Sequence, residues 1–366
     1  MLTNKRLSMR LSYPFLSYPF FDALEQSGCT TEATGWNPMH VTELQIETDF
    51  FMPLYNKTHS MGEYVFDYVW ANAFHQYRLN YYPKLVTSIP FTPVQGPRIS
   101  TKSPMNRQLC ESLLDHVKKQ CQISTASSWH MLFADRDTVG HFKDSDLMTR
   151  YGIQFHWKNK EYKSFDDFLC TLNARKRKMI KKERMSIHDQ SIDVNTHFGA
   201  DISQEVWNFF FKMYERTYFK RNGTRGYLNK TFFDLLSISM RDQLCMAVAK
   251  KDQRLIGCAL YFFDQDKLYG RYWGSTDEYE FLHFELCCYQ GIEIAIEKKM
   301  KIFDAGAQGE HKLLRGFEPV KTRSLHWIKN EDFRKAISDF LVREKKEIDI
   351  QMEACRQILP FKKTTL

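Results

Sequence analysis

The stretch Lys267-Leu-Tyr-Gly-Arg-Tyr-Trp273, the helical pattern that runs on to Lys299, and Ile302-Phe-Asp-Ala305 decide how this chain is interpreted. Aromatic and apolar residues bounded by glycines predict strands for the first and last segments. In a strand–helix–strand unit, ligands gather at the carboxyl ends of the strands. Six ionisable residues are expected at those ends: Arg271, His283, Glu285, Asp304, Glu310 and His311. The stretch therefore predicts a reaction site.

The start of the helix in this unit is predicted from a capping signature. Asp277 and Glu280 have the Asp-x-x-Glu spacing, so we expect the helix to begin near Glu278. The first N–H groups of a helix have no partner within it and can bind an anion. The pattern predicts an anion site at the end of strand 267–273.

Glu285 is the first candidate for catalysis. It shares one helical stripe with four apolar residues: Phe281, Cys288, Ile292 and Ala295. A carboxylate with apolar neighbours loses hydration and takes up a proton more readily, which suits a general base. The alternative is a structural ion pair, with Arg271 as the expected partner.

The segment after the last strand supplies further candidates. Gly306 and Gly309 allow close approach of the backbone to a ligand. Asp304 ends the strand, and Glu310, His311 and Lys312 follow the glycines. A single histidine, such as His283 or His311, is more often a hydrogen-bonded structural residue, and that alternative stays open.

Composition limits the class of protein. The chain has 366 residues, a formal net charge of +8 and nine cysteines without a Cys-x-x-Cys pair. These values predict a folded protein of two domains with reduced thiols, and no metal, flavin or nicotinamide site is expected. No signal peptide or membrane-spanning run is expected, so the prediction is a cytoplasmic protein that can still touch a membrane peripherally.

The pattern of elements divides the chain into three parts. Residues 1–160 are predicted as one mixed α/β half, with strand-like runs that include 63–70. Residues 161–192 are predicted as a basic connecting helix, and residues 193–366 as a second half that ends in a long helix. Lys and Arg occupy seven of the ten positions from Arg175 to Arg184, which favours contact with phosphates; a solvated helix face is the alternative.

The segments 282–297 and 303–319 resemble the FemAB-like predicted N-acyltransferases, relatives of the Fem peptidoglycan aminoacyltransferases within the GNAT superfamily. Further blocks follow in the family's order at 59–67, 81–85, 90–98, 128–133, 154–157 and 175–184. The resemblance implies an α/β fold with two GNAT-like domains in tandem. It also implies a single acyl-transfer site, in the second domain or between the two, whose oxyanion donors come from two strands that splay apart.

On that resemblance, strands 267–273 and 302–305 are the splayed pair, and Glu285 or His311 takes the proton of the attacking amine. The predicted substrate contacts are Arg271, Tyr272, His283, Asp304, Glu310 and Lys312, together with His59 and Glu63 of the resembling block 59–67. The phosphate contacts that the resemblance implies, to tRNA or a nucleotide-linked precursor, are Arg175, Lys176, Arg177 and Lys178.

One segment departs from the acetyl-CoA-binding pattern of the superfamily. Where that pattern has a glycine-rich loop, this chain has Gly274-Ser-Thr-Asp-Glu-Tyr-Glu280, with one glycine and three acids. The donor is therefore left open between aminoacyl-tRNA and an acyl-CoA. The expected function is transfer of an acyl or aminoacyl group to an amine of a cell-wall precursor, amino sugar or peptide; the alternative is a non-catalytic protein of the same fold that binds RNA or an anionic glycan.

Overall fold

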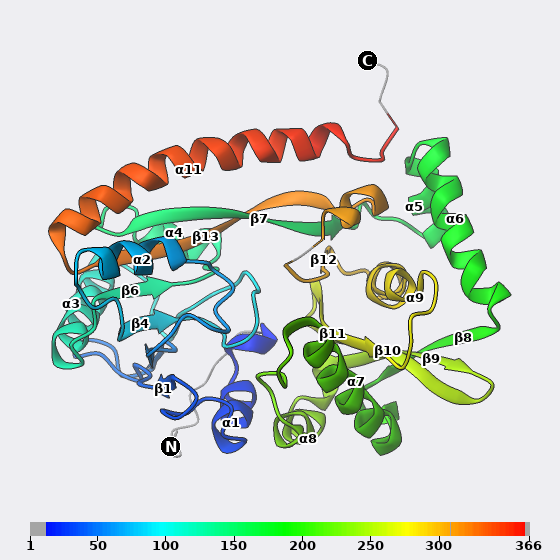
Figure 1. Ribbon diagram of the computed structural model, residues 1–366, viewed down its shortest axis with the longest axis horizontal. Helices are drawn as coiled ribbons and strands as arrows, with labels where there is room; N and C mark the ends of the chain where they lie inside the picture. Colours follow the sequence, from blue (N-terminus) through cyan, green and yellow to red (C-terminus); the bar gives the residue numbers. More distant parts are fainter. Residues whose placement is uncertain (1–11, 308, 363–366) are drawn as a thin grey trace. The chain divides into compact units, whose positions relative to one another are not determined.

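A computed structural model describes residues 12–307 and 309–362 of the chain (Figure 1). The chain divides into two compact units. Unit 1 comprises Met1–Ile153 and Lys321–Gln351, and unit 2 comprises Gln154–Val320 and Met352–Leu366. Strands β7 (Met148–Lys158) and β13 (Glu318–Ile328) and helix α11 (Glu331–Gln357) each contain a point where the chain passes from one unit to the other.

Unit 1 is built around a mixed sheet with the strand order β1-β3-β4-β6-β13. Its remaining elements are η1 (Pro14–Leu16), α1 (Tyr18–Gln26), β1 (Trp36–Pro38), β2 (Phe50–Phe51), β3 (Tyr55–Lys57), α2 (Tyr68–Gln76), β4 (Lys84–Thr87), β5 (Ser100–Thr101), α3 (Arg107–Ile123), β6 (Ser128–Met131) and α4 (Arg136–His141). Strand β4 pairs in parallel with β6, and β6 pairs antiparallel with β13.

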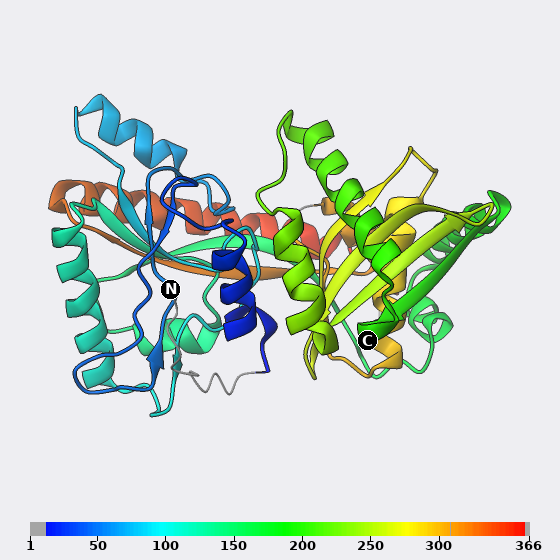
Figure 2. The same ribbon diagram turned by 90° about the horizontal axis from the view of Figure 1, so that it is seen from below.

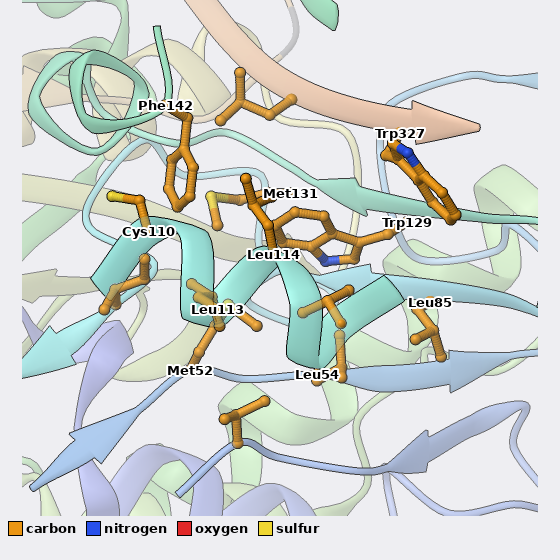
Figure 3. Packing of buried hydrophobic residues seen from close by; sticks show 14 of the residues in the cluster. Met52, Leu54, Leu85, Cys110, Leu113, Leu114, Trp129, Met131, Phe142 and Trp327 are labelled. Atoms are coloured by element: carbon orange, nitrogen blue, oxygen red, sulfur yellow. The ribbon is translucent and has the colours of Figure 1, made fainter. Parts of the chain in front are cut away.

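Helix α3 covers the core of unit 1 (Figure 3). The side chain of Asn106 caps the helix by accepting the N–H of Leu109 at 2.9 Å. Leu113 and Val117 continue the buried stripe at helical spacing, and this stripe belongs to the same apolar cluster as Trp129 of β6. The amphipathic pattern of the sequence thus determines which face of α3 meets the sheet.

Unit 2 contains the sheet β7-β12-β11-β10-β9-β8. Its elements are α5 (Phe165–Thr171), α6 (Ala174–Asp189), β8 (Ile192–Phe198), η2 (Gly199–Asp201), α7 (Gln204–Asn222), α8 (Lys230–Ser239), η3 (Arg241–Gln243), β9 (Leu244–Lys251), β10 (Arg254–Phe263), β11 (Lys267–Ser275), α9 (Leu282–Phe284), η4 (Glu285–Tyr289), α10 (Gln290–Glu297), β12 (Ile302–Asp304) and η5 (Glu310–Arg315). Strands β8 to β11 pair antiparallel, and β12 runs parallel to β11.

The parallel pairing of β11 and β12 is short, and this positions the candidate site. It extends only from Lys267 and Ile302 to Tyr269 and Asp304, after which β12 ends while β11 continues. The connection between them contains α9, one π-helical turn (η4) and α10. In the π turn the N–H of Gln290 donates to the carbonyl of Glu285, so the turn holds one more residue than an α-helical turn.

The mixed α/β class is confirmed, but the units end at other residues than predicted. Residues 321–351 belong to unit 1, because β13 pairs with β6, and because Ile337 and Leu341 of α11 pack in one apolar cluster with Trp70. The basic helix belongs to unit 2 and is interrupted. A new helix, α6, begins after Asn173, whose side chain accepts the N–H of Lys176.

Two local predictions are wrong. Residues 63–70 do not form a strand; they form a loop and the first turn of α2. The helix after β11 begins at Leu282 instead of near Glu278, and neither Asp277 nor Glu280 caps it. Its N-cap is Phe281, which has a left-handed backbone (φ 62°) and makes no side-chain cap. Thr276 continues the strand by donating its N–H to the carbonyl of Ile256 at 2.8 Å, which delays the helix.

Within the described part of the chain, every helix is too short or too polar to cross a membrane.

Candidate active site

The end of β12 is closed by a buried ion pair between Arg271 and Asp304. The guanidinium donates to the two carboxylate oxygens at 2.6 and 3.3 Å, and the N–H of Gly306 donates to Asp304 at 2.9 Å. Burial alone would raise the pKa of Asp304, but the charge of Arg271 outweighs burial and holds that pKa below its usual value. Both were predicted as substrate contacts, and here they bind each other.

Glu285 lies in the π turn and is buried against Arg184 of α6. Arg184 donates to its two oxygens at 3.0 and 3.2 Å, and the amide of Gln290 donates at 2.8 Å. Arg184 also binds Glu293 at 2.7 Å. Burial lowers the pKa of Arg184, and the two carboxylates overcome this and raise it. The geometry is that of a structural ion pair, but its partner is Arg184 and not Arg271.

A second buried pair joins α6 to η5. Arg315 donates to the two oxygens of Glu183 at 2.7 and 2.9 Å, and Tyr289 of the π turn also donates its hydroxyl to Glu183. The guanidinium carbon lies 3.4 Å from the ring centroid of Phe284. This network fixes the segment that carries His311 against both the basic helix and the π turn.

Four side chains from β11, α9 and η5 form a group that we call the imidazole cluster: Trp273, His283, His311 and Lys312. The ring centroids of His283 and Trp273 are 4.6 Å apart, and those of His283 and His311 are 5.7 Å apart. Burial, reinforced by His311, lowers the pKa of His283 to about 3. Burial, reinforced by Arg315, lowers the pKa of His311 to about 4. Both imidazoles are therefore neutral at physiological pH.

Lys312 contributes the positive charge of the cluster. It is buried, and its Nζ donates to the carbonyls of Ala305 and Gly306 at 2.8 and 2.7 Å. Burial lowers the pKa of Lys312. No carboxylate of the described residues hydrogen-bonds this amine, in contrast to Arg271, Arg184 and Arg315. Its charge is held by main-chain oxygens beyond the end of β12.

Two polar atoms of the imidazole cluster have no partner. Nε2 of His311 and Nε1 of Trp273 are buried, and neither forms a hydrogen bond within residues 12–307 and 309–362. Buried polar atoms are nearly always hydrogen-bonded, so these two lack the partner that such atoms usually have. Gly309 makes room for the imidazole: its φ is 109°, and a Cβ there would lie 2.3 Å from the ring of His311.

The remaining predicted contacts of unit 2 lie elsewhere. Tyr272 packs in an aromatic core, with ring centroids 5.4 Å from Tyr214 and 5.7 Å from Phe233. Glu310 is exposed. No hydrogen bond or ring contact within the described residues joins Glu285 to His311. The two predicted catalytic residues therefore do not act on one another.

The four predicted phosphate contacts lie in the first turns of α6. Arg175 and Lys178 are exposed, whereas Lys176 and Arg177 are partly buried. Arg177 also donates to the carbonyl of Leu172 at 3.3 Å. The face of α6 that bears the exposed cations is separate from the buried stripe of Ile180, Glu183 and Ile187.

His59 and Glu63 belong to unit 1. Nζ of Lys84 lies 2.8 Å from Glu63 and also binds Asp67, and all three side chains are buried. Burial raises the pKa of Glu63, and Lys84 opposes this effect. His59 contacts the carbonyl of Thr34 at 3.0 Å. Within unit 1, Glu63 and His59 thus make structural contacts, and a role in substrate binding stays a prediction.

The sequence analysis missed Glu183, Arg184 and Arg315. A signal was present for the first, because Glu183 interrupts a run of basic residues and falls in the apolar stripe of α6. Arg315 stands in the quoted segment after His311, but nothing in the sequence indicates its partner. No group of three or more metal-binding side chains occurs among the described residues.

Comparison with known proteins places this fold. The structure is similar to that of FemX, with 12% sequence identity, 91% of this chain and 96% of that chain covered, and a TM-score of 0.54. It is similar to the C-terminal domain of a putative lysylphosphatidylglycerol synthetase from Agrobacterium fabrum (9% identity, 92% and 94% covered, TM-score 0.51). It is also similar to L-PGS from Bacillus licheniformis (10% identity, 89% and 95% covered, TM-score 0.51).

The search of curated proteins gave no match. The FemAB-like family model, described as peptidoglycan biosynthesis/recognition, matches residues 4–363. This match confirms the predicted resemblance and the predicted class of enzyme, an acyl or aminoacyl transferase. The chain therefore belongs to the FemAB-like family.

Proposed function

We propose that this protein transfers an aminoacyl group to an amine of a peptidoglycan precursor, an amino sugar or a peptide, and that the imidazole cluster is the reaction site. The observation that carries the proposal is the pair of unpartnered buried atoms, His311 Nε2 and Trp273 Nε1, whose rings both lie against His283. Family membership supports the class of reaction. The similarity to FemX and to a putative lysylphosphatidylglycerol synthetase, as they are named, fits an aminoacyl donor.

The chemistry requires a proton acceptor and a partner for the oxyanion. When an amine attacks an ester carbonyl, the amine loses a proton while negative charge develops on the carbonyl oxygen. Neutral His311 is a weak base, and it can accept the proton at a ring nitrogen once attack on the carbonyl has made the amine acidic. The indole N–H of Trp273 and the charge of Lys312 can stabilise the oxygen. The ester bond breaks as the amide bond forms, and the leaving oxygen takes the proton from His311 and becomes a hydroxyl.

The basic face of α6 supports tRNA as the carrier of the donor. Arg175, Lys178, Lys181 and Lys182 are exposed, whereas Arg184 on the same helix is engaged with two carboxylates. Exposed cations at this density bind phosphates with an affinity that falls steeply as salt rises. We therefore favour aminoacyl-tRNA over an acyl-CoA as the donor.

The test is a transfer assay. Purified protein is mixed with charged tRNA or a panel of acyl-CoAs and with candidate amines, and products are read by mass spectrometry. His311→Ala should lower the rate by about 10² to 10⁴-fold, the range for loss of a general base. Glu310→Ala is the matched control, because this neighbour on η5 is exposed, and its rate should stay within about twofold of the unmodified protein.

Two results would contradict the proposal. One is transfer by His311→Ala at the unmodified rate. The other is tight tRNA binding without any product, equal in the His311→Ala variant and the unmodified protein, which would identify a binding protein that retains the fold.

A further inference from the structure

Unit 1 has an unusual concentration of exposed apolar side chains between Met61 and Leu79. Phe66, Tyr68 and Val69 are 63%, 55% and 66% exposed. Six of the fifteen large apolar side chains that are exposed in the described part of the chain fall in this segment: Met61, Phe66, Tyr68, Val69, Tyr77 and Leu79. The others are distributed over both units. Clustered exposed apolar side chains mark an interaction surface, whereas scattered ones need no explanation.

Hydrogen bonds to residues outside the segment hold its backbone in place. Asp67 is buried and binds Lys84, and it accepts the hydroxyl of Tyr81 at 2.5 Å. The carbonyl of Phe66 accepts a hydrogen bond from Arg150 at 2.8 Å. These polar contacts fix the loop with Phe66 facing outward.

Helix α2 continues the same surface. Its inner face carries Trp70 and Phe74, which are buried in an apolar cluster with Tyr81, and Tyr68 and Val69 are exposed. The rings of Phe66 and Tyr68 are stacked, with centroids 6.1 Å apart. Figure 2 shows α2, in light blue, standing out from the body of unit 1. The apolar side chains therefore sit on a projection of this unit.

The charges of the segment favour one kind of partner. Its two acidic residues, Glu63 and Asp67, are buried and bound to Lys84, and its one arginine, Arg78, is exposed. Among the segment's own residues, the exposed side chains are thus mainly aromatic and apolar, with the polar Asn72, His75 and Gln76, one arginine and no carboxylate. Aromatic and apolar side chains beside cations are typical of segments that lie in the interface of a bilayer, where anionic headgroups attract the cations.

We propose that the segment Met61–Leu79 binds the surface of a lipid bilayer that contains anionic phospholipid, with Phe66, Tyr68 and Val69 entering the boundary between headgroups and acyl chains. A protein partner would form about one hydrogen bond per 100–200 Å² of interface. Of the three side chains that enter this boundary, only Tyr68 offers such a group, at its hydroxyl, which favours lipid. This proposal is independent of the reaction at the imidazole cluster.

Sedimentation with vesicles tests the proposal. The full chain is mixed with vesicles of phosphatidylglycerol and phosphatidylcholine, or of phosphatidylcholine alone. We expect binding to the anionic vesicles that falls at least tenfold in the triple variant F66S/Y68S/V69S. The matched control F219S/I238S removes two side chains of similar exposure from α7 and α8 and should bind as the unmodified protein does. No binding by the unmodified protein, or an equal loss in the control, would overturn the proposal.

A second measurement does not remove apolar surface. In Val69→Trp, the added indole fluorescence should be quenched by brominated lipid within the vesicles, and in Ile238→Trp it should not. Equal quenching of the two variants would overturn the proposal. So would sedimentation velocity that shows a dimer in the absence of lipid which F66S/Y68S/V69S converts to monomer, because the surface would then bind a second copy of this chain.

Discussion

The π turn that carries Glu285 and the η5 segment that carries His311 are two regions of unit 2 that differ in whether a buried polar group has hydrogen-bond partners. Glu285 accepts three hydrogen bonds, from Arg184 and Gln290, whereas His311 Nε2 has no partner among the described residues. Both residues were predicted to be catalytic from their positions in the chain. Under the proposed function, burial of a reactive group is a weaker sign of function than burial without a partner.

Arg315 links the two regions, because it lies on the short helix that presents His311 and its Nε donates to the hydroxyl of Tyr289 in the π turn at 2.9 Å. Engaged pairs of this kind maintain the shape of the segment. On this view, changes at Arg315 or Glu285 should act mainly on stability, whereas changes at His311 should act mainly on the rate of transfer.

The largest effect on stability is expected at Arg315. Arg315→Leu leaves the carboxylate of Glu183 buried beside Tyr289 with its positive partner removed, and breaking a buried pair in this way costs about 3–5 kcal/mol. The free energy of unfolding from urea titration measures it. The double variant E183L/R315L should recover part of the loss, since no unpaired charge remains. A loss below about 1 kcal/mol in R315L would show that the pair does not anchor η5.

A smaller effect is expected at Glu285. Glu285→Gln keeps the size of the side chain and one acceptor oxygen but removes the charge that faces Arg184, which should cost about 1–3 kcal/mol of unfolding free energy. The transfer rate should stay within about twofold. If the rate fell by a hundredfold or more while the stability was unchanged, Glu285 would be the proton acceptor and the contrast with His311 would be wrong.

A third effect is expected in the pH dependence of stability. Because the pKa of His283 falls from 6.5 to about 3 on folding, the unfolded chain binds more protons than the folded one between these values. Its contribution is therefore complete above pH 6.5 and is lost as the pH falls toward 3. His283→Asn cannot titrate, so its unfolding free energy should decline less steeply from pH 6.5 to 4. Parallel curves for the variant and the unmodified protein would contradict the burial of this imidazole.

Much of the fold could be predicted from the sequence because its patterns are local. The amphipathic stripe of α3, the strands β9 to β11 and the long final helix all follow from spacing within one segment. The limits of the units could not be predicted, because β13 pairs with β6, a strand far away in the sequence. No local sequence pattern near residue 321 indicates that pairing.

The candidate site was predictable as a region but not in its connections. The segment from 268 to 327 contains the imidazole cluster, yet the partner of Glu285 lies 101 residues away on a helix that was interpreted as a phosphate contact. The prediction of where the helix after β11 begins was wrong for a local reason. Phe281 adopts a left-handed backbone that a capping signature does not anticipate.

The π turn at Glu285–Tyr289 sets the phase of the helix that follows it. In this turn the amide of Gln290 donates to Glu285, and the guanidinium of Arg184 donates to both Glu285 and Glu293. Removing a single residue, for example Cys287, would restore the α-helical repeat. It would also rotate α9 and the start of the π turn by about 100° relative to α10. The contacts between α6 and the segment that connects β11 to β12 thus depend on the number of residues in one turn. A chain one residue shorter could not form the same ion pairs between Arg184 and these two carboxylates.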